Sequence, residues 1–137
     1  ADGSDGKAVD ELTSAIGDVG GRPVIVAPKV GGAKMADGSI QKADGQLAGT
    51  PSVLFDAIAV VLSEEGCQAL LNEAAAVQFV MDAFGHLKAI GHSKEAKPLL
   101  DKAGVRADAG VVAIGKSFLD AAGTRHWDRE PKVRTLA

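Results

Sequence analysis

Four short, unbroken apolar runs limit what this chain can fold into. They occupy residues 24–27, 57–62, 89–91 and 111–114, and most are rich in β-branched side chains. Apolar residues that alternate with polar ones indicate strands with one wet face, whereas unbroken runs indicate strands buried on both faces, as in a parallel sheet. We therefore predict a mainly parallel sheet that is covered on both sides.

Segments with helical periodicity lie between these runs. Residues 7–17 place Val9, Leu12 and Ile16 on one face, and Asp5 is suited to cap the N-terminus of this helix. Further helices are expected after Ser63, Asn72 and Ser93 and over residues 116–125. Alternating strands and helices predict an α/β layered fold with right-handed crossovers.

Two stretches depart from this alternation. Residues 31–49 contain paired turn signals at 36–38 and 43–45, which favour a small β excursion over a crossover helix. Residues 127–137 are charged and lack apolar periodicity, so we predict an extended tail that lies over a surface or a neighbouring subunit. The α/β domain is then expected to span residues 1–126.

The composition excludes several classes of protein. With 46% hydrophobic and 24% charged residues, the chain is not a disordered one. No apolar run approaches the roughly 20 residues of a membrane helix, and a net charge of −3 gives no electrostatic reason to expect nucleic acid. A single cysteine forms no internal disulfide, so the fold does not depend on an oxidising compartment. We expect a cytoplasmic location.

Cys67 is the first candidate for chemistry. It follows a predicted helix start, where the helix dipole favours a thiolate, but Glu64 and Glu65 oppose that charge. Free cysteine behaves mostly as a small hydrophobic residue. We therefore favour a packing role over a reactive one.

A second candidate is the pair His92 and Ser93, directly after a buried strand. A nucleophile elbow needs small residues on both sides of the reactive one, and only Gly91 meets that need. An inert strand-to-helix turn capped by Ser93 is the favoured interpretation.

The remaining histidines and the basic residues near the C-terminus point to no site. His86 and His126 fall near predicted helix ends, where imidazolium complements the dipole, and no third metal ligand stands at a recognisable spacing. Acidic residues interleave with the basic ones, so we expect salt bridges and not phosphate binding; the acidic residues are Asp128 and Glu130, and the basic ones are Arg125, Arg129, Lys132 and Arg134. We assign no catalytic, cofactor-binding or metal-binding residue.

Five stretches, taken in order, resemble the C-terminal domain of large-subunit haem catalases of the hydroperoxidase II type. They are residues 1–6, 36–45, 49–57, 80–90 and 125–132, and together they span essentially the whole chain. The resemblance implies a flavodoxin-like three-layer sandwich, similar to the class I glutamine amidotransferase-like superfamily. It also implies a parent enzyme that is a homotetramer, binds haem and dismutes hydrogen peroxide to water and oxygen.

Members of that superfamily place an acidic residue after the first strand, facing a cysteine on the elbow. Asp5 falls near the acidic position, but residues 89–94 hold no cysteine, and Cys67 lies in a different loop. The resemblance therefore implies an accessory, non-catalytic domain whose partners are the catalase core domain and neighbouring subunits. The haem belongs to the parent enzyme, and the absence of tyrosine here agrees with this, since catalase iron takes an axial tyrosine.

Two alternatives remain open. The first is a redox-linked holdase chaperone with unfolded client proteins as partners, which would need an exposed apolar groove. The second is a cysteine-dependent hydrolase or glyoxalase that uses Cys67.

The opening loop, residues 1–6, leads straight into the first helix with no strand before it. In an α/β unit such a loop normally follows the C-terminal end of a strand, so we expect that the first strand was cut away or that another segment takes its place. The resemblance agrees, since family members carry a strand just before this loop. That strand is internal in a flavodoxin-like sheet, so its absence leaves two neighbours with unpaired backbone groups. We expect marginal stability or aggregation, which the upstream residues would relieve.

Overall fold

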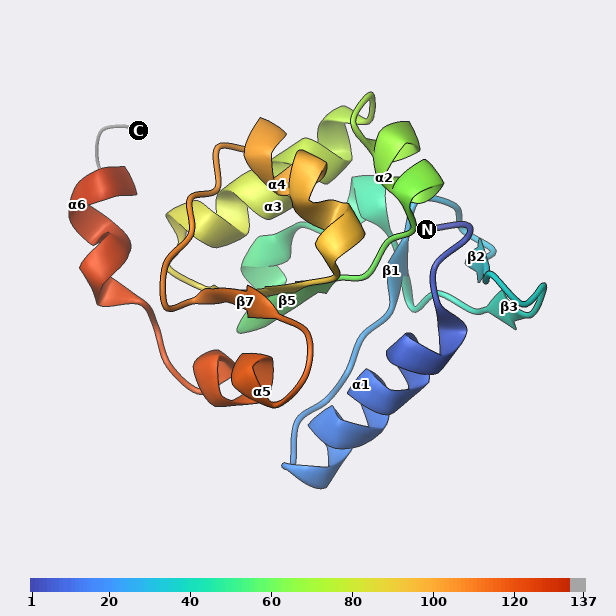
Figure 1. The fold of residues 1–137 in the computed structure, drawn as a ribbon, viewed down its shortest axis with the longest axis horizontal. Helices are drawn as coiled ribbons and strands as arrows, with labels where there is room; N and C mark the ends of the chain where they lie inside the picture. The colour runs from blue at the N-terminus through green and yellow to red at the C-terminus, as the bar shows by residue number, and fades with distance from the viewer. Residues whose placement is uncertain (134–137) are drawn as a thin grey trace.

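The computed structural model describes residues 1–133 and builds them around a parallel three-stranded sheet (Figure 1). Its strands are β5 (Ala57–Val60), β6 (Ala89–His92) and β7 (Val111–Ala113), with β6 in the middle. The register places Ile58 opposite Ile90, and Ile90 opposite Val111. Three of the four apolar runs therefore form neighbouring parallel strands, as the sequence predicts.

Helices cover both faces of this sheet. Figure 1 shows α2, α3 and α4 on one side and α1 and α5 on the other. The helices of the described residues are α1 (Gly6–Asp18), α2 (Glu64–Leu70), α3 (Ala74–Gly85), α4 (Lys97–Lys102), α5 (Lys116–Ala122) and α6 (Glu130–Val133). Short 3-10 turns add η1 (Leu47–Gly49), η2 (Ser52–Leu54), η3 (Lys94–Ala96) and η4 (Trp127–Arg129). None of the helices within residues 1–133 has the length and apolar character needed to cross a bilayer.

Each face of the sheet has its own apolar cluster. Ile58 and Ile90 belong to the larger cluster, under α2, α3 and α4. On the opposite face, Ala89 packs with Leu12 of α1 and Phe118 of α5. Burial on both faces explains why the strand sequences are unbroken apolar runs.

A glycine in the central strand lets α5 approach closely. A Cβ added at Gly91 would lie 2.6 Å from the ring of Phe118, closer than non-bonded carbon atoms come. The small residue next to the predicted elbow therefore serves helix–sheet packing.

The other strands are short. β1 (Val26–Ala27) pairs in parallel with β4 (Gly45–Gln46), and β2 (Ala33–Lys34) pairs antiparallel with β3 (Ile40–Gln41). The β2–β3 hairpin confirms the small β excursion predicted within residues 31–49. Of the apolar run at 24–27, only Val26 and Ala27 enter a ladder.

Both helix caps that the sequence indicates at Asp5 and Ser63 are confirmed. The Asp5 carboxylate accepts the N–H of Lys7 at 3.0 Å, and the Ser63 hydroxyl accepts the N–H of Gly66 at 3.0 Å. Asn72 does not start α3, because the N–H of Glu73 still bonds Leu70 in the turn that ends α2. The helix begins at Ala74.

The C-terminal residues also differ from the expectation. Where the sequence predicts an extended tail, residues 127–133 form η4 and α6, and Arg129 is buried. The expected end of α5 near Arg125 moves back to Ala122, with Gly123 as its C-cap. The rest of the predicted tail, residues 134–137, lies outside the described residues.

Candidate functional site

An apolar groove lies between β1 and β5. Among the described residues, β1 pairs only with β4 and β5 only with β6, so each of these two strands keeps one edge without a strand partner. The groove has a volume of about 760 Å³ and is lined by Val26, Ala59, Leu12 of α1 and Val80 of α3. Of the described residues that line it, only Arg22 and Asp56 carry charged side chains.

Residues 1–4 close one end of this groove. The Asp2 carboxylate pairs with the Lys29 ammonium at 2.8 Å and accepts the N–H of Lys34 at 3.0 Å, and these bonds hold the pKa of Asp2 below its ordinary value. The hydroxyl of Ser4 is buried and donates to the carbonyl of Val61 at 2.7 Å. The loop therefore bonds to segments that follow both β1 and β5.

Cys67 lies inside the protein core. It is 0% exposed on α2, and it packs in the larger cluster with Leu70 and Leu99. The expected packing role is confirmed. The Asp5 carboxylate caps α1, where it also accepts the N–H of Ala8 at 3.3 Å.

Ser93 lies at the turn after β6, as predicted, but its hydroxyl does not cap the following turn. It donates to the carbonyl of Leu62 at 3.1 Å and accepts the N–H of Leu62 at 3.0 Å. The ring nitrogen Nδ1 of His92 is 3.0 Å from the carbonyl oxygen of Ser93. The side chain of Ser93 therefore ties the ends of β5 and β6 together.

The other two histidines lie near helix ends. His86 is the C-cap of α3, which confirms the expected position, and its carbonyl accepts a bond from exposed Arg125 at 2.9 Å. The Nε2 atom of His126 is 3.1 Å from the carbonyl oxygen of Ala121 in α5. Within residues 1–133, no three side chains among His, Cys, Asp and Glu gather as a metal ion would require.

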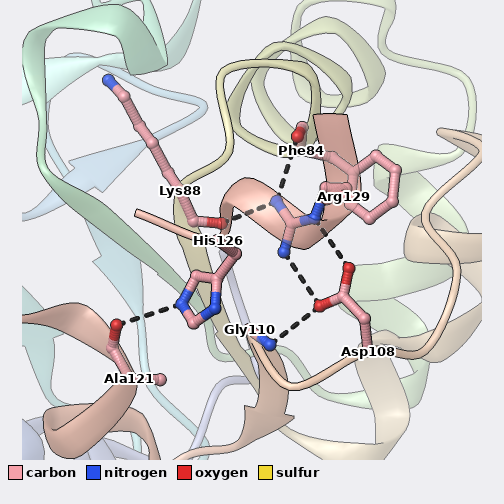
Figure 2. Close-up of polar contacts among 7 residues, drawn as sticks. All are labelled: Phe84, Lys88, Asp108, Gly110, Ala121, His126 and Arg129. Carbon is pink, nitrogen blue, oxygen red and sulfur yellow. Dashed lines mark hydrogen bonds and ion pairs between the residues drawn. The ribbon is translucent and has the colours of Figure 1, made fainter. Parts of the chain in front are cut away.

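An ion pair between buried Arg129 and partly exposed Asp108 joins η4 to the body of the domain (Figure 2). Arg129 Nε lies 2.7 Å from Oδ2 of Asp108, and Nη2 lies 3.0 Å from Oδ1. Nη1 donates to the carbonyls of Phe84 and Lys88 at 3.0 and 2.9 Å, and the guanidinium carbon lies 4.2 Å from the centre of the Phe84 ring. A Cβ at Gly110 would meet Nη2 at 2.7 Å, so a glycine is needed beside the pair.

Two opposing effects determine the charge of Asp108. Burial raises its pKa, but the bonds from Arg129 and from the N–H of Gly110, together with nearby positive charge, outweigh burial and hold the pKa below its ordinary value. The carboxylate therefore stays charged opposite the guanidinium. The donors of Arg129 and the acceptor oxygens of Asp108 are therefore already paired with each other. We call this ion pair the clamp, because it serves to hold the structure together.

Lys88 is a second buried cation. It is 3% exposed, and its ammonium donates to the carbonyls of Ser52 and Val53 at 2.9 and 3.0 Å. Burial lowers its pKa, and the charge of Arg125 adds to that effect. This contact ties η2 to the start of β6.

Sequence reasoning missed the clamp, the buried lysine and the groove. Its salt-bridge interpretation placed the partner of Arg129 among its neighbours in the sequence, whereas Asp108 stands 21 positions away. One local pattern could have indicated the buried lysine: Lys88 is a charged residue directly before the buried strand β6.

Comparison with known proteins agrees with this picture. The family described as the C-terminal domain found in long catalases matches residues 1–131. Catalase C of Rhizobium meliloti (strain 1021) is 40% identical over 97% of this chain and 20% of the relative. Catalase HPII of Pseudomonas putida is 31% identical over 99% of the chain and 20% of the relative. The chain thus spans about one fifth of the length of these curated relatives.

Solved structures with the same architecture show low sequence identity. DJ-1 of Schizosaccharomyces pombe superposes with a TM-score of 0.71 at 12% identity, covering 98% of this chain and 94% of the other. The VC2308 protein gives 0.68 at 19% identity over 88% of this chain and 62% of the other. These likenesses show the fold, which is the flavodoxin-like fold of the DJ-1/ThiJ/PfpI proteins, as the resemblance to large-subunit catalases implies. The match over residues 1–131 shows that the chain belongs to the family of C-terminal domains found in long catalases.

Proposed function

We propose that this chain is the accessory C-terminal domain of a large-subunit haem catalase, which dismutes hydrogen peroxide to water and oxygen. The family match over residues 1–131 carries this proposal. The domain itself contributes architecture and not catalysis. In support, the thiol of Cys67 is buried in the core and the hydroxyl of Ser93 is bonded to Leu62.

The residues of this chain do not fit a catalase haem. Such iron takes a tyrosine as its axial ligand, and the sequence contains no tyrosine. The haem and its ligand therefore belong to the core domain of the parent enzyme in this proposal.

The proposed partners are that catalase core domain and neighbouring subunits of a homotetramer. Large apolar side chains are available for such contacts, because Trp127 is 68% exposed and Leu54 is 66% exposed. The proposed location is the cytoplasm.

Peroxide decay tests the proposal directly. We expect the isolated chain with added hemin to remove hydrogen peroxide no faster than hemin alone, whereas the long protein turns it over as a catalase. Hemin with an unrelated protein of similar size serves as the control. Turnover by the isolated chain comparable to that of the long protein would contradict the accessory role.

A holdase chaperone is a second candidate, favoured by the apolar groove between β1 and β5. An open apolar groove is the feature that binding of unfolded clients requires. If this function holds, the chain suppresses aggregation of a heated client protein at near-stoichiometric ratio. Absence of suppression would exclude it.

A further inference from the structure

The turn between α3 and β6 holds a leucine where glycine is usual. The N–H of Leu87 donates to the carbonyl of Phe84 at 3.1 Å, and the N–H of Lys88 donates to that of Ala83 at 3.0 Å. These two bonds form a Schellman motif, in which the residue at the position of Leu87 is left-handed and most often glycine. The φ of Leu87 is 65°, and within residues 1–133 no other non-glycine residue has a positive φ. Because its Cβ disfavours this conformation, surrounding contacts must hold it.

A segment near the C-terminus supplies such contacts. Residues 125–129, which we call the strap, donate hydrogen bonds to four carbonyls of this turn. These carbonyls belong to Phe84, His86, Leu87 and Lys88. Arg129 makes two of the bonds, at 3.0 and 2.9 Å, and the N–H of His126 makes a third, at 2.8 Å. The strap therefore binds the turn at and around its left-handed residue.

Lys88 connects the turn to η2. Its carbonyl accepts the bond from Arg129, while its ammonium donates to the carbonyls of Ser52 and Val53. Figure 2 shows its side chain directed away from Arg129 and the strap. The carbonyl of Ser52 also accepts the N–H of Phe55 at 3.1 Å, so the lysine bonds the same group that closes η2. A change in the backbone at Leu87 would move the base of this side chain and so its ammonium.

We propose that the strap controls the attachment of η2 through the conformation of Leu87. While Arg129 is docked, the turn stays left-handed and Lys88 holds η2 against the domain. When the strap leaves, the turn relaxes and η2 is released. The strap carries Trp127, 68% exposed, and η2 carries Leu54, 66% exposed, so each segment presents an apolar side chain to a partner protein. Because such coupling is reciprocal, a partner that displaces one segment also loosens the other.

Hydrogen–deuterium exchange of the full chain, followed by mass spectrometry, tests the coupling. We expect Arg129→Ala to speed exchange within residues 52–57 about tenfold and to leave residues 24–27 unchanged. Leu70→Ala is the matched control, because it removes a buried side chain from α2, which packs against α4. Equal acceleration of residues 52–57 by this control would overturn the proposal, since loss of global stability would then explain the effect.

Substitutions at Leu87 test whether its conformation transmits the effect. Leu87→Ala and Leu87→Gly both remove the buried side chain, but only glycine adopts a positive φ without cost. With alanine at this position, Arg129→Ala should still speed exchange within residues 52–57 about tenfold. With glycine the turn keeps its conformation without the strap, so the acceleration should fall below about threefold. The same acceleration in both backgrounds would overturn the proposal.

Substitution of Lys88 tests the last step. Lys88→Met should speed exchange within residues 52–57 as Arg129→Ala does, and the double variant should exchange there no faster than either single one. Exposed Lys97→Met is the control and should change nothing there. Effects of the two substitutions that multiply in the double variant would show two independent contacts and overturn the proposal.

A milder substitution covers the case in which Arg129→Ala does not fold. Arg129→Lys keeps a positive charge opposite Asp108 but lacks the planar fork that reaches both the carboxylate and two carbonyls. It should also speed exchange within residues 52–57. Exchange there as slow as in the wild type, with faster exchange confined to the strap, would overturn the proposal.

Discussion

The two edges of the sheet differ in whether their buried polar groups have partners. Beside β7, Arg129 carries a charge into the core and meets Asp108 and two carbonyls within 3.0 Å. At the other side, Val26 and Ala59 line an apolar groove between two strands, each of which keeps one edge without a strand partner among the described residues. A single side chain from a distant segment completes the first site, whereas a strand edge is completed only by more backbone. Side chains of this chain therefore close the clamp, whereas the strand edges at the groove have no strand partner among residues 1–133.

Removing the arginine of the clamp should have the largest effect. Arg129→Ala leaves the Asp108 carboxylate without its partner. Because the Asp108 side chain is 21% exposed, we expect a loss of unfolding free energy towards the lower end of the about 3–5 kcal/mol that breaking a fully buried pair costs. Urea unfolding followed by circular dichroism measures this loss. Arg125→Ala is the matched control, because Arg125 is exposed and bonds one carbonyl. Equal losses of unfolding free energy in both variants would show that the ion pair with Asp108 stabilises the fold no more than an exposed arginine does.

Acid should weaken the clamp through protonation of Asp108. The pKa of Asp108 is lower in the folded protein than its ordinary value, so its stabilisation is complete above the unfolded pKa of about 3.9 and is lost as pH falls through the folded value. The free energy difference between wild type and Asp108→Asn should shrink below about pH 4. Urea unfolding between pH 7 and pH 2 measures it, with exposed Asp120→Asn as the control. A difference that is constant with pH would contradict the prediction.

A smaller loss of stability is expected at the end of the groove that residues 1–4 close. Ser4→Ala leaves the carbonyl of Val61 without its 2.7 Å partner, and a buried unpaired acceptor costs about 1–3 kcal/mol. Ser39→Ala is the control, since its hydroxyl bonds exposed Asp37 and should change stability by less than about 0.5 kcal/mol. Thermal unfolding compares the two. If Ser4→Ala has the same Tm as the wild type, water replaces the hydroxyl as the hydrogen-bond donor to the Val61 carbonyl, which contradicts the prediction.

The smallest effect is expected for substitution of Cys67 on peroxide turnover. Cys67→Ser in the long protein should leave peroxide turnover per haem unchanged, because the thiol lies in the core of an accessory domain. Oxygen release measures the turnover, and haem absorbance normalises it. Loss of activity with normal haem content would favour the cysteine-dependent alternative.

Features that depend on neighbours in the sequence were predictable. Asp5 and Ser63 cap helices through bonds to N–H groups two or three residues onward, so the local pattern contains the whole interaction. The unbroken apolar runs likewise indicate, within a few residues, that their strands are buried on both faces. The missing cap at Ser93 shows the limit, since its hydroxyl bonds Leu62, 31 positions away.

By itself, the sequence determined the α/β architecture, most of the strands and the helix caps at Asp5 and Ser63, because periodicity and capping act over a few residues. Only the tertiary structure decided that Arg129 is buried opposite Asp108 and that Val26 and Ala59 border one groove. Those pairings join residues that are distant in the chain, and their geometry depends on how the layers pack. The physical reason is the range of the interaction: a buried charge or an open strand edge is defined by what the rest of the fold places beside it.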